Sequence, residues 1–534
     1  MDTRPSTDKA TRGRTREGHV PEPRRDTWHA PGTPGPHPRD TPDTVPVESP
    51  SRRRYWALLL PALTLLALVT RLPSFARPLW NPDEGFLATQ ARMLADGGTL
   101  YDTVVDRKPP LLPWLYQGAF ALAGDESLWP LKAAAVLAVA VGAAFVASLA
   151  RRRWGDRAGW TAGVLYVLLT IGLNPEDTQA ATFEVFMLPW TAAAVWCADR
   201  RRWAWAGLGI AGAVLTKQTG GAVLLPVLVL LWRAPAPRLP GLARLAAGAV
   251  LPVAITALAF GPGRFLYWMA TGSGAYASVE GAGLRALARA LASTGVLALA
   301  CAPFLVALVH LWLRRRRPEW SADLWAWLAA SAAAIVVGFQ FFGHYYLQLV
   351  PPLALLGASV LRELRRPRHA DLALALTAAI AAGHLVWGYA APRTELDHAQ
   401  RVAAEVRART QPSDRVLLWG MHPEGYWLAD RAPASRYLTA GFLTNFSGGR
   451  GGVRVGERYA MEGAWPHFRR ELRDTPPALV VDDSRGAPYG IASTPTLRNY
   501  LERHYDRVGE VDGAVLYVRG NAGSAPHGGV ARDG

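Results

Sequence analysis

Two adjacent carboxylates, Asp83 and Glu84, lie in a short polar stretch that follows the first long apolar run of the chain. A lysine, Lys108, comes about 25 residues later and directly precedes two prolines, which hold its backbone extended. A carboxylate that removes a proton from a hydroxyl makes it a better nucleophile, which is worth about 10²–10⁴ in rate. A lysine at a low-dielectric surface stabilises the charge of a phosphate leaving group. The stretch therefore predicts chemistry in which a hydroxyl displaces a phosphate beside a membrane.

Further polar side chains fall near the same ends of the apolar runs, and these are Asp102, Lys217, Arg264, His344 and Tyr345. Ionisable groups gathered at one membrane face are costly unless they serve a site, so we expect these residues to bind the substrate. Each type also has a simpler interpretation. Asp102 fits a turn, and His344 fits a satisfied interfacial histidine. Snorkelling to the lipid headgroups is the simpler interpretation for the cations Lys108, Lys217 and Arg264.

The acidic pair has a structural alternative as well. Asn81, Pro82 and Glu84 have the types and spacing of a helix start, with Asn as the N-cap and Pro in the first turn. Three further acids fit capping or solvation of a second outer loop better than a site, and these are Glu176, Asp177 and Glu184. The catalytic and the capping interpretations of Asp83 and Glu84 both stay open at this point.

The elements that must position these residues are apolar helices. The chain has 534 residues, of which 50% are apolar and only 19% are charged, which is too apolar for an ordinary soluble enzyme of this length. Eleven apolar runs are candidates to span a membrane: 55–71, 128–150, 158–173, 182–198, 203–216, 218–233, 243–260, 290–313, 322–341, 345–361 and 370–391. Arginine clusters follow alternate runs. If each cluster is cytoplasmic, the runs alternate in direction without conflict, with the N-terminus inside.

The sequence thus predicts a polytopic α-helical membrane protein with about eleven transmembrane helices, located in the plasma membrane. Residues 1–50 are rich in Pro and Arg and predict a disordered cytoplasmic tail. Residues 51–391 form the predicted transmembrane domain, with a first outer loop at 72–127. Within that loop, residues 111–123 are too short for a span and predict an interfacial helix. Residues 203–233 are short for two spans, so we expect two short helices broken at Lys217.

Residues 392–534 change character and predict a small α/β domain on the outer side. Three short segments read as buried strands, and these are 415–420, 478–483 and 514–518. Two segments, 395–408 and 494–504, read as helices beside them. Strands that alternate with helices favour an α/β fold.

Charge and cysteine content exclude other classes. The net charge of +16 comes from arginines beside apolar runs, where they act as topology signals, so we expect no nucleic-acid partner. Cys197 and Cys301 fall inside apolar runs and are expected to be packing residues. No zinc-ligand spacing is present, and the sequence predicts no cofactor, although it leaves a divalent metal open.

The polar motifs resemble those of the GT-C class of polyprenyl-phosphate-sugar glycosyltransferases, which includes the protein O-mannosyltransferases and the aminoarabinose transferase of lipid A. The resemblance covers about residues 55–391. It is carried by Asn-Pro-Asp-Glu-Gly85, Tyr-Asp102, Lys108-Pro-Pro, Leu-Thr-Lys217 and Gly-His-Tyr-Tyr-Leu-Gln348.

The resemblance implies an inverting transfer of a monosaccharide from a polyprenyl phosphate to an acceptor hydroxyl on the outer side of the membrane. Asp83 matches the family's catalytic carboxylate, and Lys108 matches the lysine that contacts the donor phosphate. His344 and Tyr345 match late polar residues near that phosphate. Lys217 and Arg264 are assigned to the same role on less distinctive neighbours. The acceptor is a protein, a glycan or a lipid, and the sugar is mannose-like or pentose-like.

Two other classes of protein remain as alternatives. A lipid or glycan transporter would place ionisable residues in the middle of its spans and show an internal repeat. A non-catalytic scaffold that binds the cell wall would explain the C-terminal domain but would leave Asp83 and Lys108 without a role.

Overall fold

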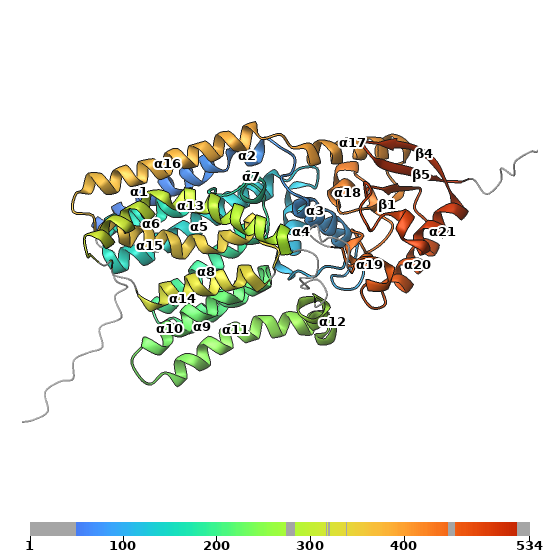
Figure 1. The fold of residues 1–534 in the computed structure, drawn as a ribbon. Coiled ribbons are helices and arrows are strands. Elements are labelled where there is room, and N and C mark those ends of the chain that lie inside the picture. The colour runs from blue at the N-terminus through green and yellow to red at the C-terminus, as the bar shows by residue number, and fades with distance from the viewer. Residues whose placement is uncertain are drawn as a thin grey trace, which may run out of the picture. The chain divides into compact units, whose positions relative to one another are not determined.

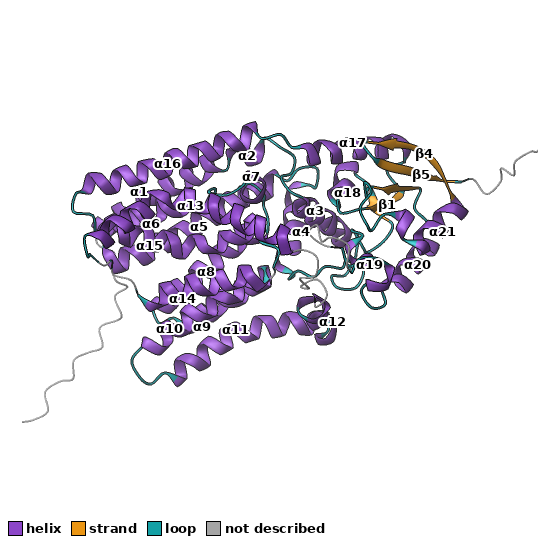
Figure 2. Ribbon diagram, in the orientation of Figure 1, coloured by secondary structure: helices purple, strands orange, loops and turns teal. Residues whose placement is uncertain are grey.

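Helices account for most of the chain between residues 50 and 390 in the computed structural model, and strands occur only near the C-terminus of the described chain (Figures 1 and 2). The structure describes residues 50–273, 283–316, 318, 321–337, 339–446 and 454–520. The predicted disordered tail, 1–50, lies outside these residues apart from Pro50. Each of the eleven predicted apolar runs forms a helix, which confirms the mostly helical fold class.

The helices formed by these runs are α1 (Pro50–Thr70), α5 (Trp129–Trp154), α6 (Asp156–Leu169), α8 (Phe183–Asp199), α9 (Trp203–Thr216), α10 (Leu224–Arg233), α11 (Leu239–Phe260), α13 (Gly283–Leu313), α14 (Ala322–Val337), α15 (Val350–Arg362) and α16 (Pro367–Ala390). The connecting segments contain α2 (Leu72–Phe75), α3 (Pro82–Ala95), α4 (Leu111–Ala123), α7 (Pro175–Thr178) and α12 (Pro262–Met269). Short 3₁₀ helices, η1 (Gln218–Val223) and η3 (Gly343–Leu349), precede α10 and α15.

Five helical segments of the described chain are long and apolar enough to cross a membrane, and these are Arg53–Thr70, Trp129–Trp154, Leu239–Phe260, Gly283–Leu313 and Pro367–Arg409. Other apolar helices are shorter, so the number of spans stays a prediction. Helix α9 ends at Thr216, and η1 follows Lys217. The predicted break between two short helices at Lys217 is therefore confirmed.

Small residues allow helices α9 and α11 to pack closely. A Cβ atom added to Gly207 of α9 would lie 2.2 Å from the carbonyl oxygen of Leu245, and one added to Gly248 of α11 would lie 2.1 Å from that of Ala204. Apolar side chains gain little from contacting one another rather than lipid, so close backbone approach through small residues is a main source of helix association in a membrane.

One cluster of charges ties three helix ends together at the arginine-rich end of the bundle. Arg153, at the end of α5, forms ion pairs with Asp199 at the end of α8 (3.1 Å) and with Asp323 at the start of α14 (2.7 Å). These helix ends were predicted to share the cytoplasmic side. The structure shows that they share one end of the bundle, and the side of the membrane stays a prediction.

The C-terminal segment forms a small domain around a five-stranded mixed sheet. Its strands are β1 (Arg415–Trp419), β2 (Ala432–Pro433), β3 (Leu479–Asp482), β4 (Tyr505–Val511) and β5 (Ala514–Arg519), in the order β2-β1-β3-β5-β4. Strand β1 pairs in parallel with β2 and β3, whereas β5 pairs antiparallel with β3 and β4. The helices are α17 (Thr394–Arg409), α18 (Glu424–Ala429), α19 (Gly441–Thr444), α20 (Ala464–Asp474) and α21 (Pro495–His504). The predicted α/β fold is confirmed.

Successive side chains of a strand point to opposite faces of a sheet, and in β1 they are apolar on both. Helices therefore cover both faces of this sheet. Val416 and Leu418 of β1 belong to the core that contains Val402 of α17, whereas Leu417 belongs to the core that contains Phe468 of α20. The described residues from 53 to 520 belong to one compact unit, so this domain and the helical bundle pack together.

Candidate active site

Helix α3 presents the predicted acidic pair in its first turn. Asn81 caps the helix, since its side chain accepts a hydrogen bond from the backbone N–H of Glu84 (3.2 Å), and Pro82 is the first helical residue. Both types are favoured at these positions because the cap satisfies a free N–H and proline lacks one. The predicted helix start is thus present, and it places Asp83 and Glu84 at the positive end of the helix dipole.

Glu84 is fully buried and serves as a hydrogen-bond acceptor between two loops. Its two carboxylate oxygens accept the backbone N–H of Trp80 (2.5 Å) and that of Ala181 (2.7 Å). Arg71 holds the same second loop, because its guanidinium donates to the carbonyl oxygens of residues 178–180. The surroundings of Glu84 are those of a structural carboxylate that joins the first outer loop to the second.

Asp83, one residue earlier, is half-buried and differs in its contacts. Its side chain forms no hydrogen bond or ion pair with any residue that the structure describes. It lies close enough to Asp106 and Lys217 to interact with them electrostatically. A carboxylate without a protein partner keeps its lone pairs available to accept a proton from a bound molecule.

The segment 106–108 lies within electrostatic range of Asp83. Asp106 is buried and accepts a hydrogen bond from the Gln90 amide (3.2 Å). Burial raises the pKa of Asp106 to about 6, an effect that Lys108 opposes and Asp83 reinforces. The ammonium group of Lys108 lies over the ring of Phe183, 4.6 Å from its centroid. Lys108 is therefore turned toward the start of helix α8.

A second group of polar residues comes from the break after α9 and from η3, which precedes α15. The Lys217 ammonium group forms an ion pair with Glu184 and lies 4.1 Å from the centroid of the Tyr345 ring. Lys217 and Glu184 are both buried. His344, next to Tyr345, forms a hydrogen bond with Asp177 (2.7 Å). The acids of the second outer loop thus pair with two residues predicted to bind substrate.

Electrostatic interactions link the two groups, since Glu184 interacts with Lys108 and His344 as well as with Lys217. The structure therefore brings together five of the eight predicted site residues, and these are Asp83, Lys108, Lys217, His344 and Tyr345. Sequence reasoning missed Asp106 and undervalued Asp177 and Glu184. A signal for Asp106 was present, because it lies two residues before Lys108 in the same motif.

Asp102 and Arg264 lie apart from this cluster and pair with each other. Their side chains form an ion pair (3.0 Å) and are each about half exposed, at 48% and 46%. The carbonyl oxygen of Asp102 also accepts a hydrogen bond from Arg436 of the C-terminal domain (2.8 Å). This pair links the first loop, helix α12 and the C-terminal domain.

Tyr101, next to Asp102 in the first loop, joins helix α12 to the backbone of Lys108. It adopts a positive φ of 68°, which is uncommon for a residue with a side chain. Its carbonyl oxygen accepts a hydrogen bond from the Trp268 indole (3.1 Å), and its hydroxyl donates to the carbonyl oxygen of Lys108 (2.8 Å). Tyr101 thereby anchors the backbone of the residue predicted to bind phosphate.

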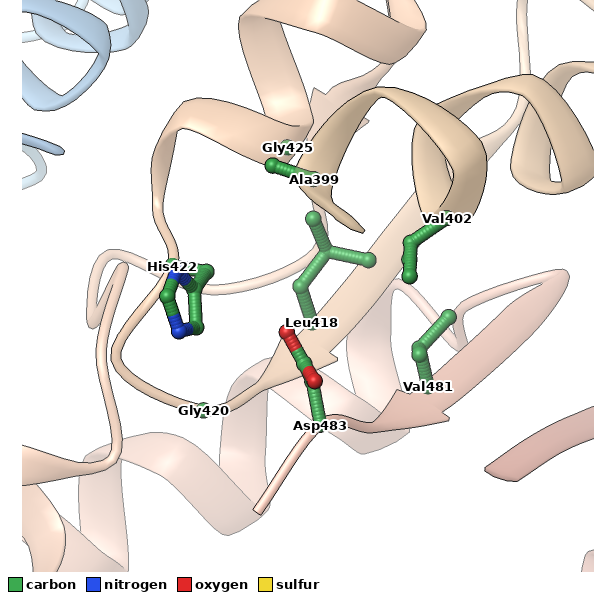
Figure 3. Close-up of a pocket in the computed structure, with 8 residues that line it drawn as sticks. All are labelled: Ala399, Val402, Leu418, Gly420, His422, Gly425, Val481 and Asp483. Atoms are coloured by element: carbon green, nitrogen blue, oxygen red, sulfur yellow. The ribbon is translucent and has the colours of Figure 1, made fainter. Parts of the chain in front are cut away.

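The C-terminal domain has a second polar cluster where its parallel strands end. His422 follows β1 and Asp483 follows β3, and both border a small cavity that is also lined by Leu418 and Gly420 (Figure 3). Asp483 forms a hydrogen bond with His398 of α17 (2.8 Å). The cavity measures about 10 Å³, which is room for about one water molecule and not for a sugar.

A larger cavity, of about 200 Å³, lies against the first loop. Arg107, Tyr267, Asn445 and Glu462 are among the residues that line it. Arg107 belongs to the same extended segment as Lys108, but its guanidinium lies over the Phe442 ring of the C-terminal domain, 5.0 Å from the centroid. The two neighbouring cations therefore face different parts of the molecule.

In the part of the chain that the structure describes, no three His, Cys, Asp or Glu side chains lie together in a way that could hold a metal ion.

Part of the chain that carries this site matches a known protein family. Residues 107–268 match the family model described as dolichyl-phosphate-mannose-protein mannosyltransferase. This match covers less than a third of the chain and includes Lys108, Lys217 and Arg264. No curated protein matches the chain.

Solved structures of ArnT from Cupriavidus metallidurans share the fold. The structure bound to undecaprenyl phosphate aligns with a TM-score of 0.55 at 16% identity, over 88% of this chain and 99% of that chain. The apo structure aligns with the same score and identity, over 87% and 98%. An oligosaccharyltransferase from Archaeoglobus fulgidus, tethered to an acceptor peptide, aligns with a TM-score of 0.45 at 12% identity, over 88% and 74%. The predicted resemblance to GT-C glycosyltransferases is confirmed for the fold and for the family domain at 107–268.

Proposed function

We propose that the protein is a membrane glycosyltransferase that moves a monosaccharide from a polyprenyl phosphate to an acceptor hydroxyl. The observation that carries the proposal is the environment of Asp83. It is a half-buried carboxylate without a hydrogen-bond partner among the described residues, and it lies beside a cluster that contains two lysines and a histidine. A carboxylate kept free next to cations suits a reaction that needs one base and releases one anion.

In this reaction Asp83 accepts the proton of the acceptor hydroxyl as the hydroxyl oxygen attacks the anomeric carbon of the sugar. The bond between that carbon and the phosphate oxygen breaks, and its electron pair stays on the polyprenyl phosphate. A phosphate leaving group needs no acid to protonate it, so one free carboxylate is sufficient. Glycoside hydrolysis differs in using two carboxylates on opposite sides of the bond. A single displacement of this kind inverts the anomeric configuration.

The leaving phosphate gains negative charge, and we assign its stabilisation first to Lys108. Lys217 contributes less net charge because Glu184 already pairs with it. His344 approaches the same group of residues and is oriented by Asp177. We assign Lys217, His344 and Tyr345 to shaping the phosphate site. Asp102 and Arg264 are assigned to holding the first loop against α12 and the C-terminal domain.

The identity of the substrates is part of the proposal. The likeness to ArnT, which was solved with undecaprenyl phosphate, supports a polyprenyl phosphate donor. The mannosyltransferase description of the family model supports a mannose-like sugar, although a pentose-like sugar fits the fold equally well. The acceptor hydroxyl belongs to a protein, a glycan or a lipid. The site faces the outer side of the plasma membrane, with the N-terminus in the cytoplasm.

The test is transfer by purified protein reconstituted in vesicles, with radiolabelled polyprenyl-phosphate mannose and polyprenyl-phosphate arabinose as donors. We expect one donor to bind and its label to appear in an acceptor from a membrane extract. Movement of the intact donor across the bilayer without cleavage would instead identify a transporter. If neither donor binds, the proposed function is wrong.

A further inference from the structure

Helix α3, which carries Asp83, packs against helix α18 of the C-terminal domain along one face. Gly85, Thr89 and Arg92 are spaced four and three residues apart, so they share that face. Thr89 Oγ1 lies 3.5 Å from the carbonyl oxygen of Pro423, which directly precedes α18. Arg92 forms an ion pair with Asp430, which directly follows α18 (2.9 Å). The contact therefore extends from one end of α18 to the other.

Gly85, two residues after Asp83, lies directly against Glu424 of α18. A Cβ atom built on Gly85 would lie 2.2 Å from Cβ and 2.4 Å from Cα of Glu424. Real Cβ atoms essentially never come this close, so any side chain at position 85 must push α3 and α18 apart. The glycine is therefore required by the packing of the two helices.

Glu424 is fixed from the other side by the sheet of the C-terminal domain. Its carboxylate is buried and accepts a hydrogen bond from His422 Nδ1 (2.9 Å). His422, which Figure 3 shows beside the small cavity, follows β1 and contacts Arg485 (2.9 Å). The hydroxyl of Tyr426, also on α18, accepts the backbone N–H of Leu418 in β1 (2.9 Å). Helix α18 is thus anchored to the strand rather than free to adjust.

We propose that the C-terminal domain positions the catalytic base, with Gly85 and Glu424 as the positioning residues. The proposal rests on the function proposed above for Asp83. Asp83 and Gly85 lie about half a turn apart on α3, and a helix moves as a rigid element over that distance. The position of α18 against Gly85 therefore sets the position of Asp83. Misplacing a catalytic group by about 1 Å can cost about 100-fold in rate. The domain then acts on the reaction without touching either substrate.

The test compares Gly85→Ala with Gly118→Ala in reconstituted protein. Gly118 lies in α4 of the same loop, and a Cβ added there meets nothing within 4 Å. We expect Gly85→Ala to lower kcat at least 10-fold, to leave donor affinity unchanged and to increase hydrogen exchange in residues 82–95. Gly118→Ala should leave all three quantities at the wild-type level.

A second pair of variants covers the case in which Gly85→Ala does not fold. Glu424→Gly removes the Cβ atom that meets Gly85 and should lower kcat without changing donor affinity. Glu424→Gln keeps the Cβ atom and an oxygen that can accept the hydrogen bond from His422, so this variant should transfer sugar at the wild-type rate. A folded Gly85→Ala variant that transfers sugar at the wild-type rate would overturn this inference alone, and so would a Glu424→Gly variant that does so where Gly85→Ala does not fold. A wild-type protein that binds no donor would overturn the proposed function and the inference with it.

Discussion

Glu84 and Asp83 share the first turn of helix α3, yet of the two side chains only that of Glu84 forms hydrogen bonds with residues that the structure describes. Both Glu84 oxygens accept backbone N–H groups, whereas Asp83 faces a cluster of charged residues without a bond of its own. The two residues of the predicted acidic pair therefore have different surroundings. We assign the chemistry to Asp83 and the joining of the two outer loops to Glu84.

The structural role of Glu84 predicts a loss of stability in Glu84→Gln. The amide offers one oxygen, so either the Trp80 or the Ala181 N–H faces an NH₂ group. Leaving a buried donor unsatisfied costs about 1–3 kcal/mol, and the free energy of unfolding should fall by that amount. Denaturant unfolding in detergent measures it. The control is Asp96→Asn at the exposed end of α3, which should keep wild-type stability. A Glu84→Gln variant as stable as that control would contradict the assignment.

Lys108→Met should weaken donor binding at least 10-fold, because a charge-assisted contact to phosphate is lost. Isothermal titration with the polyprenyl-phosphate sugar that the wild type binds measures the affinity. The matched control is Arg157→Met, which removes a cation from an exposed ion pair with Asp371 at the start of α16. That variant should bind donor like the wild type. Equal affinities in the two variants would show that Lys108 does not contact the phosphate.

Lys217→Met should destabilise the protein by about 3–5 kcal/mol, because it leaves Glu184 buried without its partner. The double variant Lys217→Met, Glu184→Leu removes both charges and should recover most of that loss. Unfolding curves of the two singles and the double form a double-mutant cycle that isolates the pair. Strictly additive losses would mean that the two residues do not interact.

Asp106 should make stability depend on pH. Burial raises its pKa from 3.8 to about 6, so the folded state binds the proton more tightly than the unfolded state does. Its stabilising contribution is therefore fully present below about pH 4 and is lost as the pH rises through about 6. The loss is worth about 3 kcal/mol at 1.36 kcal/mol per pKa unit.

The Asp106→Asn variant should accordingly show a smaller fall in the free energy of unfolding between pH 4 and pH 7 than the wild type. Unfolding measured at several pH values gives both curves. The Asp96→Asn variant, which changes an exposed acid in the same loop, should follow the wild-type curve. Parallel curves for wild type and Asp106→Asn would show that Asp106 titrates near its ordinary value.

Local patterns predicted the elements of the fold well. The cap and proline at Asn81 and Pro82 marked the start of α3, and the apolar runs marked the helices. Strands β1, β3 and β5 were visible because they are short apolar runs. Strand β4 (Tyr505–Val511) was not predicted, since its side chains are largely polar and exposed at the edge of the sheet. Strand β2 has only two residues, too few to form a pattern.

The site was harder to predict because its partners are distant in the chain. Asp83 and Glu84 are alike in sequence, and what separates them is Ala181, which lies 97 residues beyond Glu84. Likewise, Glu184 looked like a loop acid until the fold placed it against Lys217. The role of Gly85 depends on a contact with Glu424 in another domain. Only the tertiary structure contains these relationships.

The role of Asp83 as the catalytic base is tested most directly by comparing sugar transfer by Asp83→Asn with transfer by wild type and Asp96→Asn. Each protein is reconstituted with the radiolabelled polyprenyl-phosphate donor, and donor binding is measured in the same preparation. We expect Asp83→Asn to bind donor normally but to transfer at least 100-fold more slowly, whereas Asp96→Asn should behave as the wild type. Wild-type transfer by Asp83→Asn would contradict the assignment of Asp83 as the base.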